Sequence, residues 1–188
     1  MRQYDLIYVA QLIKRKCPMF VVELMKRLPG KSLLVIGDGP MRTEFIGGLS
    51  DAGVSYKWHP RVAFDEIPLM FARAKICVFP TLEDTWGIVA NEALAAGCPV
   101  ITTAEAGCAG ELVIHGVNGS ILPLKPGMWA TEIKWLLCNY DEHLHWLDIG
   151  GNLYQYTREV AAAKIIAACN LAGESGRYRN TRLIYEAE

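Results

Sequence analysis

Net charge of either sign is nearly absent from this sequence. Its 19 lysines and arginines are balanced by 20 aspartates and glutamates, which leaves a net charge of −1 over 188 residues. A chain without excess positive charge has no global attraction for nucleic acid or for an anionic membrane surface. We therefore expect no nucleic-acid partner, and any anionic ligand must be held by a local site.

Long apolar runs are missing as well. No segment approaches the ~18 consecutive apolar residues of a membrane span, and the first residues do not form a signal-peptide pattern. We expect a soluble, cytoplasmic protein without a transmembrane segment. Peripheral contact with a membrane, through a partner, is compatible with this composition.

Clustered metal ligands are also lacking. The six cysteines are scattered, without a C-x-x-C pair: Cys17, Cys77, Cys98, Cys108, Cys138 and Cys169. Zinc and redox sites need closely spaced ligands, so we expect no metal and no cofactor, and reduced cysteines that act as small buried side chains. The dinucleotide fingerprint G-x-G-x-x-G does not follow the first strand candidate either.

What the sequence does have is short apolar runs that alternate with segments of helical period. Six runs are strand candidates: 5–12, 32–37, 54–58, 76–81, 99–103 and 120–124. The helical segments between them are 18–28, a stretch that starts at Pro40, 65–74, 87–96 and a shorter one at 111–114. Strands that are apolar on both faces and alternate with helices predict an α/β fold, a doubly wound, Rossmann-like parallel sheet.

The pattern changes after Pro126. Two long helices are predicted at 128–140 and 157–172, and the stretch 173–188 is charged with little apolar period. We interpret residues 1–172 as one domain with C-terminal helices, and 173–188 as a loosely ordered tail.

Doubly wound sheets bind ligands where the carboxyl ends of their strands meet. At that edge the loop 82–87 leads into a helix, whose first N–H groups favour a phosphate, and Gly87 allows close approach. Glu92 lies among apolar residues of the same helix and needs a partner, such as two ribose hydroxyls. Alternatively, Asp84 only caps the helix and Glu92 pairs with a lysine or arginine.

Two other loops reach the same edge. Lys14, Arg15 and Lys16 carry enough positive charge to neutralise a diphosphate, although a solvated surface turn is the better explanation when they are taken in isolation. The turn from Gly37 to Pro40 allows backbone contact with a ligand through its two glycines, but it also suits an ordinary turn. Each signal is weak alone, and their shared place at one sheet edge is what favours a site.

Taken together, these segments resemble a known family. The matching segments are VAQLIKRK (9–16), VIGDGP (35–40), CVFPT (77–81), DTWGIVANEALAAGCPV (84–100) and GVNG (116–119). In order and spacing they resemble the C-terminal, donor-binding domain of retaining GT-B glycosyltransferases, in particular glycosyltransferase family 4 (glycosyl transferases group 1). The resemblance covers about 5–125, and its long segment at 84–100 is highly specific. It implies one half of a GT-B fold.

The resemblance also implies residue roles. The paired acids of the family, with seven residues between them, fall on Asp84 and Glu92, which would touch the donor sugar and the ribose; Lys16 would stabilise the leaving diphosphate. The base would lie near Arg61 and Val62. The wider donor-binding set is Gln11, Arg15, Gly37, Gly39, Arg61, Val62, Glu83, Trp86, Gly87, Ile88 and Val89.

The sequence departs from the family pattern at two places. The first acid is usually glutamate, so Asp84 is one methylene shorter, and Glu83 is an alternative for its role. The family usually has Gly-Arg where this chain has Ala10-Gln11, which removes one of two expected charges on the diphosphate. Arg15 is positioned in the sequence to compensate.

The implied function is that of the nucleotide-sugar-binding domain of a retaining glycosyltransferase. It would bind a UDP-, GDP- or ADP-linked sugar without an essential metal. It would transfer a hexose to an unidentified acceptor only together with an N-terminal GT-B domain, in a parent chain or a partner chain. The alternative is a non-catalytic nucleotide-sugar-binding or partner-interaction module derived from such an enzyme. A sugar-nucleotide epimerase would not explain the segment at 84–100.

Overall fold

The computed structural model describes residues 2–140, and further along residues 160, 163, 166 and 167. The chain divides into two units, Met1–Gly151 and Asn152–Glu188. In the second unit, the four described residues are helical. The predicted tail 173–188 and most of the predicted helix 157–172 lie outside the described residues, so the domain limit at residue 172 stays a prediction.

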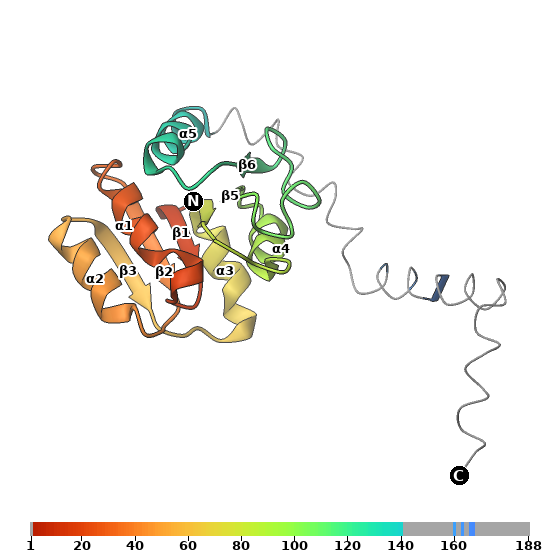
Figure 1. Ribbon diagram of the computed structural model, residues 1–188, viewed down its shortest axis with the longest axis horizontal. Coiled ribbons are helices and arrows are strands. Elements are labelled where there is room, and N and C mark those ends of the chain that lie inside the picture. The colour runs from red at the N-terminus through yellow and green to blue at the C-terminus, as the bar shows by residue number, and fades with distance from the viewer. Residues whose placement is uncertain (1, 141–159, 161–162, 164–165, 168–188) are drawn as a thin grey trace, which may run out of the picture. The chain divides into compact units, whose positions relative to one another are not determined.

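The first unit is built on one six-stranded parallel sheet, as predicted (Figure 1). Its strands are β1 (Tyr4–Val9), β2 (Ser32–Ile36), β3 (Ser55–His59), β4 (Ala74–Phe79), β5 (Val100–Thr102) and β6 (Gly119–Ile121). They lie in the order β3-β2-β1-β4-β5-β6, and every neighbouring pair is parallel. This is a doubly wound strand order.

In the described part of the first unit, four α-helices and two short 3-10 helices lie between the strands, and a fifth α-helix follows β6. They are α1 (Pro18–Met25), α2 (Arg42–Asp51), α3 (Ile67–Ala72), α4 (Ile88–Ala95), α5 (Pro126–Cys138), η1 (Lys14–Lys16) and η2 (Phe64–Glu66). Leu6 and Tyr8 of β1 share one hydrophobic core with α1, α2 and α5, where Trp129 is fully buried. Helices α3 and α4 pack against each other and against β4, so helices cover both faces of the sheet.

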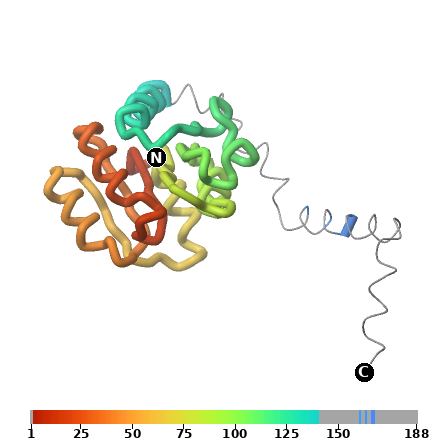
Figure 2. The backbone as a smooth tube through the Cα atoms, viewed as in Figure 1, coloured from red at the N-terminus to blue at the C-terminus, as the bar shows by residue number. Residues whose placement is uncertain are grey.

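The course of the chain creates a switch point between β1 and β4. From β1 the chain builds β2 and β3 on one side, then returns to build β4, β5 and β6 on the other side (Figure 2). The connections after β1 and after β4 therefore leave the sheet in opposite directions, which opens a crevice at their carboxyl ends. Leu6 pairs with Ile76 and Ile7 with Cys77, so this register brings the loops at 10–17 and 80–87 next to each other.

One predicted helix is wrong. Residues 111–114 form turns, held by isolated bridges between Ala109 and Val113 and between His115 and Gly119. The buried side chain of Asn118 explains the difference: its amide donates to the carbonyl of Leu112 at 2.9 Å, and its oxygen accepts from the N–H of Ile114 at 2.8 Å. These bonds satisfy backbone groups that a helix would otherwise use.

Three of the five described cysteines are buried, as the sequence analysis expects. Cys77, Cys98 and Cys108 are buried free thiols, Cys17 is half-buried, and Cys138 is exposed, contrary to the prediction.

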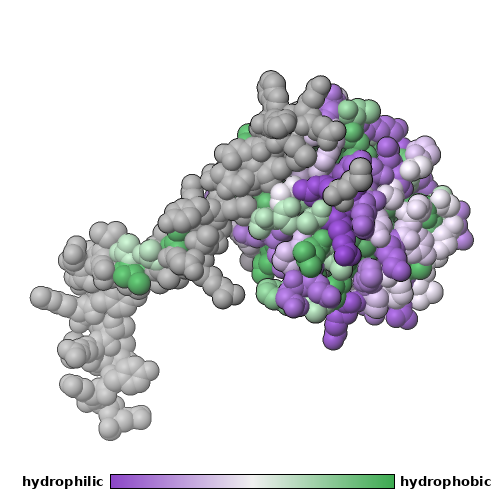
Figure 3. All heavy atoms as spheres, turned by 180° about the vertical axis from the view of Figure 1, so that it is seen from behind, coloured by the Kyte–Doolittle hydropathy of each residue, from purple (hydrophilic) through white to green (hydrophobic). Residues whose placement is uncertain are grey.

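Within the part of the chain that the structure describes, no helix is both long and apolar enough to span a membrane. The face in Figure 3 shows hydrophobic patches separated by hydrophilic side chains.

Candidate functional site

Lys16 is buried at the switch point. It ends η1, directly after β1, and only 9% of the residue is exposed, whereas Lys14 and Arg15 of the same turn are exposed. Its ammonium group lies 5.0 Å from the centroid of the Phe79 ring, a cation–π arrangement. The predicted basic turn is therefore not a uniformly solvated one, because its last lysine points into the protein.

The partner of Lys16 is Asp84, from the loop after β4. The ammonium group of Lys16 donates a hydrogen bond to Oδ2 of Asp84, and the two side chains are 11% and 17% exposed. Burial alone would raise the pKa of Asp84, but the hydrogen bond and charge of Lys16 outweigh it and hold the pKa below its usual value of 3.8. The ion pair bridges the crevice between the loops that follow β1 and β4.

Asp84 does not cap helix α4, which was the alternative interpretation. The helix N-cap is Gly87, and Oδ1 of Asp84 instead accepts the N–H of Trp86 at 3.2 Å, within the loop. Glu83, the alternative acid, is exposed, and only its backbone is engaged among the described residues: its carbonyl oxygen accepts from Arg15 at 3.2 Å and from the hydroxyl of Thr81 at 2.8 Å, and its N–H donates to that hydroxyl. The structure thus places Asp84, and not Glu83, against Lys16.

The loop after β5 fixes the backbone of Asp84, a feature that the sequence analysis missed. The N–H of Asp84 donates to the carbonyl of Glu105 at 3.2 Å, and the carbonyl of Asp84 accepts the N–H of Gly107 at 2.8 Å. A Cβ atom at Gly107 would lie 2.1 Å from the carbonyl oxygen of Thr85, so only glycine fits this approach. The sequence contained a signal for this contact, because Gly107 follows β5, which is parallel to β4 and ends at the same sheet edge.

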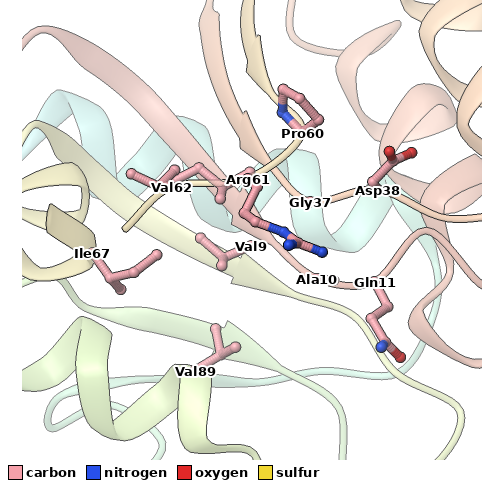
Figure 4. Close-up of a pocket in the computed structure, with 11 residues that line it drawn as sticks. Val9, Ala10, Gln11, Gly37, Asp38, Pro60, Arg61, Val62, Ile67 and Val89 are labelled. Carbon is pink, nitrogen blue, oxygen red and sulfur yellow. The ribbon is translucent and has the colours of Figure 1, made fainter. Parts of the chain in front are cut away.

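At the same edge of the sheet, a pocket of about 420 Å³ opens at the ends of β1 and β2, and neither Lys16 nor Asp84 lines it (Figure 4). Five predicted donor-binding residues line it: Gln11, Gly37, Arg61, Val62 and Val89. The remaining lining residues were not predicted: Val9, Ala10, Ile36, Asp38, Pro60 and Ile67. The Arg61 side chain reaches over the pocket towards Ala10 and Gln11. The pocket is therefore lined mostly by apolar residues, together with Gln11 and one residue of each charge, Arg61 and Asp38.

The two glycines in the turn after β2 are needed for contact with the protein's own backbone, whereas the prediction was contact with a ligand. Gly37 has φ +138°, and a Cβ atom there would lie 1.8 Å from the carbonyl oxygen of Ala10. At Gly39 the same test gives 2.6 Å to the carbonyl oxygen of Leu12. Both glycines thus permit close approach of the chain's own backbone after β1. Gly37 also lines the pocket, whereas Gly39 is not among its lining residues.

Glu92 lies on α4, three residues after Val89, and so on the same side of the helix one turn further from the pocket. Its half-buried carboxylate forms no hydrogen bond or ion pair with any residue that the structure describes, so the predicted alternative of a lysine or arginine partner is not found. Burial raises its pKa above the usual value of 4.5. Neither Glu92 nor Lys16 lines the pocket itself.

The residues around the start of α4 are arranged as follows. Gly87 has φ +97° and packs on Phe79, where a Cβ atom would lie 2.6 Å from the ring. The indole N–H of Trp86 donates to Oδ1 of Asn91 at 2.7 Å, and Ile88 is 69% exposed. The first turn of a helix leaves N–H groups without helical partners, so this end of α4 is suited to an anion.

No group of three or more potential metal ligands gathers among the described histidine, cysteine, aspartate and glutamate residues. The charged groups at this edge are instead suited to an organic anion with hydroxyl groups. Lys16 supplies a buried positive charge, Arg61 an exposed one, and Asp84 and Glu92 supply acceptors.

Comparison with known proteins identifies the family. Residues 1–151 match the family model of glycosyl transferases group 1. The chain belongs to this family. Its six-stranded sheet and flanking helices match one half of a GT-B glycosyltransferase, since the structure of HepE from Anabaena in complex with UDP and glucose superposes with a TM-score of 0.74 and 20% identity. That superposition covers 92% of this chain and 49% of HepE.

Two relatives found by sequence are much longer than this chain. An uncharacterised glycosyltransferase of Methanocaldococcus jannaschii is 27% identical over 141 residues, which is 72% of this chain and 36% of the relative. The D-inositol 3-phosphate glycosyltransferase of Mycobacterium tuberculosis is 28% identical over 141 residues, 69% of this chain and 28% of the relative. This glycosyltransferase domain thus spans about a third of the length of the curated relatives it matches.

Proposed function

We propose that this domain binds a nucleoside-diphosphate sugar at the carboxyl ends of β1, β2 and β4, as the donor half of a retaining glycosyltransferase. The observation that carries the proposal is the Lys16–Asp84 ion pair between the loops after β1 and β4, at the sheet edge that also holds a pocket of about 420 Å³. A pocket of this size suits a small ligand, and a buried lysine at the same sheet edge favours an anionic one.

The proposed binding mode combines the roles that the family resemblance implies with the positions of the side chains. The base occupies the pocket near Arg61 and Val62, and the ribose hydroxyls donate to the unpaired carboxylate of Glu92. The diphosphate lies between Lys16 and the start of α4, and the sugar contacts Asp84. The bound UDP and glucose of HepE make UDP the first nucleotide to test.

The chemistry assigned to this half is stabilisation of the leaving group. As the bond between the sugar and the diphosphate breaks, negative charge grows on the diphosphate. The ammonium group of Lys16 and the N–H groups at the start of α4 would stabilise that charge, because they are fixed before the reaction begins. Glu92 and Asp84 would hold the ribose and the sugar in place. The acceptor and its binding groups would come from an N-terminal GT-B domain.

Isothermal titration with UDP, GDP and ADP tests the proposal. At least one of these nucleotides is expected to bind with a Kd below the millimolar range, and Glu92→Ala is expected to weaken that binding without unfolding the domain. If none of the three binds at millimolar concentration, the proposed function is wrong. Equal affinity in Glu92→Ala would remove the ribose role alone.

A second candidate is a non-catalytic module that keeps the donor site or uses the sheet to bind a partner. The observation in its favour is Gln11, which places a neutral amide on the pocket wall where the family usually has an arginine. An acceptor half from a related enzyme, added to the domain with UDP-glucose, separates the two candidates. Sugar transfer supports the enzyme, and nucleotide binding without any transfer supports the module.

A further inference from the structure

The two charged groups assigned to the donor are bound to each other. Lys16 is assigned to the diphosphate and Asp84 to the sugar, yet the ammonium group of Lys16 donates directly to the carboxylate of Asp84. Among the described residues, Lys16 has no second ion pair. A diphosphate that enters the site must therefore share this lysine with Asp84, or take it from Asp84.

We propose that Asp84 is an internal counter-ion of Lys16, which makes the site discriminate against a free nucleoside diphosphate and in favour of the nucleotide sugar. This inference rests on the proposed function. It goes beyond it by assigning Asp84 a role in the specificity for the donor over the product, in addition to contact with the sugar.

The discrimination follows from the charge that each ligand brings to Asp84. The terminal phosphate of a free diphosphate carries more negative charge than the same phosphate in a nucleotide sugar, because the sugar replaces one ionisable oxygen. This extra charge would lie at Lys16, within reach of the carboxylate of Asp84, and like charges at such distances repel. A nucleotide sugar brings less charge, and its hydroxyl groups can donate to the carboxylate as the lysine turns to the phosphate.

Asp84 cannot easily avoid this competition, because its position is fixed from three sides. Its backbone bonds to Glu105 and Gly107 in the loop after β5, and its Oδ1 accepts the N–H of Trp86. Its side chain is the shorter of the two acidic types and is only 17% exposed. A fixed, partly buried carboxylate interacts with nearby charge more strongly than a solvated one does.

Lys16 is equally restrained. Its carbonyl oxygen accepts the hydroxyl of Tyr8 at 2.7 Å, and its ammonium group lies over Phe79. The backbone of Lys16 is thus held in place, and only its flexible side chain needs to move for the ammonium group to turn from Asp84 to a phosphate. These restraints make the pair a fixed element of the binding site.

Titration calorimetry with UDP and UDP-glucose tests the inference in the wild type, in Asp84→Asn and in Glu105→Gln. Asp84→Asn removes the counter-ion, so UDP is expected to bind about tenfold tighter, equivalent to about 1.4 kcal/mol, whereas UDP-glucose gains less or loses affinity. Glu105→Gln is the matched control, because it removes one negative charge from an exposed residue in the neighbouring loop after β5. It is expected to leave the ratio of the two affinities unchanged.

A second pair of variants shows whether the effect acts through Lys16. In Lys16→Met, UDP affinity falls, and adding Asp84→Asn to this variant is expected to restore much less affinity than it adds to the wild type. Melting curves of each variant check that the domain is folded. Wild-type UDP binding together with equal or weaker binding in Asp84→Asn overturns the inference but leaves the proposed function. Failure of UDP, GDP and ADP to bind to the wild type and to every variant overturns both.

Discussion

The hydroxyl group of Tyr8 donates a hydrogen bond to the carbonyl oxygen of Lys16 at 2.7 Å. Tyr8 is a fully buried residue of β1, and its ring packs edge-on against Phe45 at 5.7 Å between centroids. One core residue thus joins the hydrophobic centre of the domain to the backbone of the lysine at the candidate site. The position of Lys16 therefore depends on core packing as well as on its ion pair.

Tyr8→Phe keeps the ring and removes only this hydrogen bond. We expect the free energy of unfolding to fall by about 1–2 kcal/mol, because the buried carbonyl of Lys16 loses its partner. UDP affinity should fall severalfold as the basic turn loosens. Urea denaturation and calorimetry measure the two effects. Tyr56→Phe is the matched control, since its hydroxyl bonds to Ser50 on the surface, and a change as large as that of Tyr8→Phe would contradict the argument.

Glu92 should make the stability of the free domain depend on pH. Its pKa is raised in the folded state by burial, so the stabilising contribution is present while the group is protonated and is lost as the pH rises through the folded pKa, starting near 4.5. Glu92→Gln should therefore be slightly more stable than the wild type at pH 7, and should not show this loss.

The same substitution separates stability from binding. Because Glu92 is half exposed, solvent screening keeps the gain in stability small. UDP affinity is nevertheless expected to fall about tenfold, since two ribose hydroxyls lose a charged acceptor. Denaturation curves between pH 4 and pH 8, and titration with UDP at pH 7, are the measurements. A variant that is less stable at pH 7 would show that the carboxylate has a protein partner after all.

Much of the sheet could be predicted from the sequence, because β1, β2, β4 and β5 are local apolar runs. The charge pair at the site could not be predicted in this way. Lys16 and Asp84 are 68 positions apart, and only the strand order and register bring them together. From the residues alone, Asp84 could equally have capped the helix, and the family resemblance was what favoured a site. The error at 111–114 has a local cause instead, since the side chain of Asn118 bonds backbone groups four and six positions away that a helix would otherwise use.

Gly107 is predicted to position Asp84. In Gly107→Ala, the new methyl group would lie 2.1 Å from the carbonyl oxygen of Thr85, so the loops after β4 and β5 must separate. We expect a loss of about 1–3 kcal/mol in the free energy of unfolding, and weaker binding of UDP-glucose. Gly47→Ala in α2 is the control, because nothing lies within 4 Å of the added atom. It should stabilise the domain by about 0.5–1 kcal/mol. Equal effects of the two substitutions would rule out the positioning role.

Gln11→Arg should restore a charge that the family usually has at this place. Gln11 is exposed and lines the pocket, and Arg61 reaches towards it, so the new guanidinium would lie near another positive charge when no ligand is bound. A bound diphosphate removes that repulsion and accepts a charged hydrogen bond, worth about 1.5–3 kcal/mol before screening. We expect UDP to bind about tenfold tighter at low ionic strength, with a smaller gain at high ionic strength.

The control for this gain is Gln3→Arg, the same substitution at an exposed position that directly precedes β1, at the opposite edge of the sheet. Both variants change the net charge equally, so a general electrostatic effect would raise the UDP affinity of both. We expect the increase only for Gln11→Arg. If Gln11→Arg also enables sugar transfer with an added acceptor half, while the wild type supports nucleotide binding alone, the missing arginine explains a non-catalytic module. If both transfer sugar, Gln11 only tunes donor affinity and the domain belongs to an active enzyme.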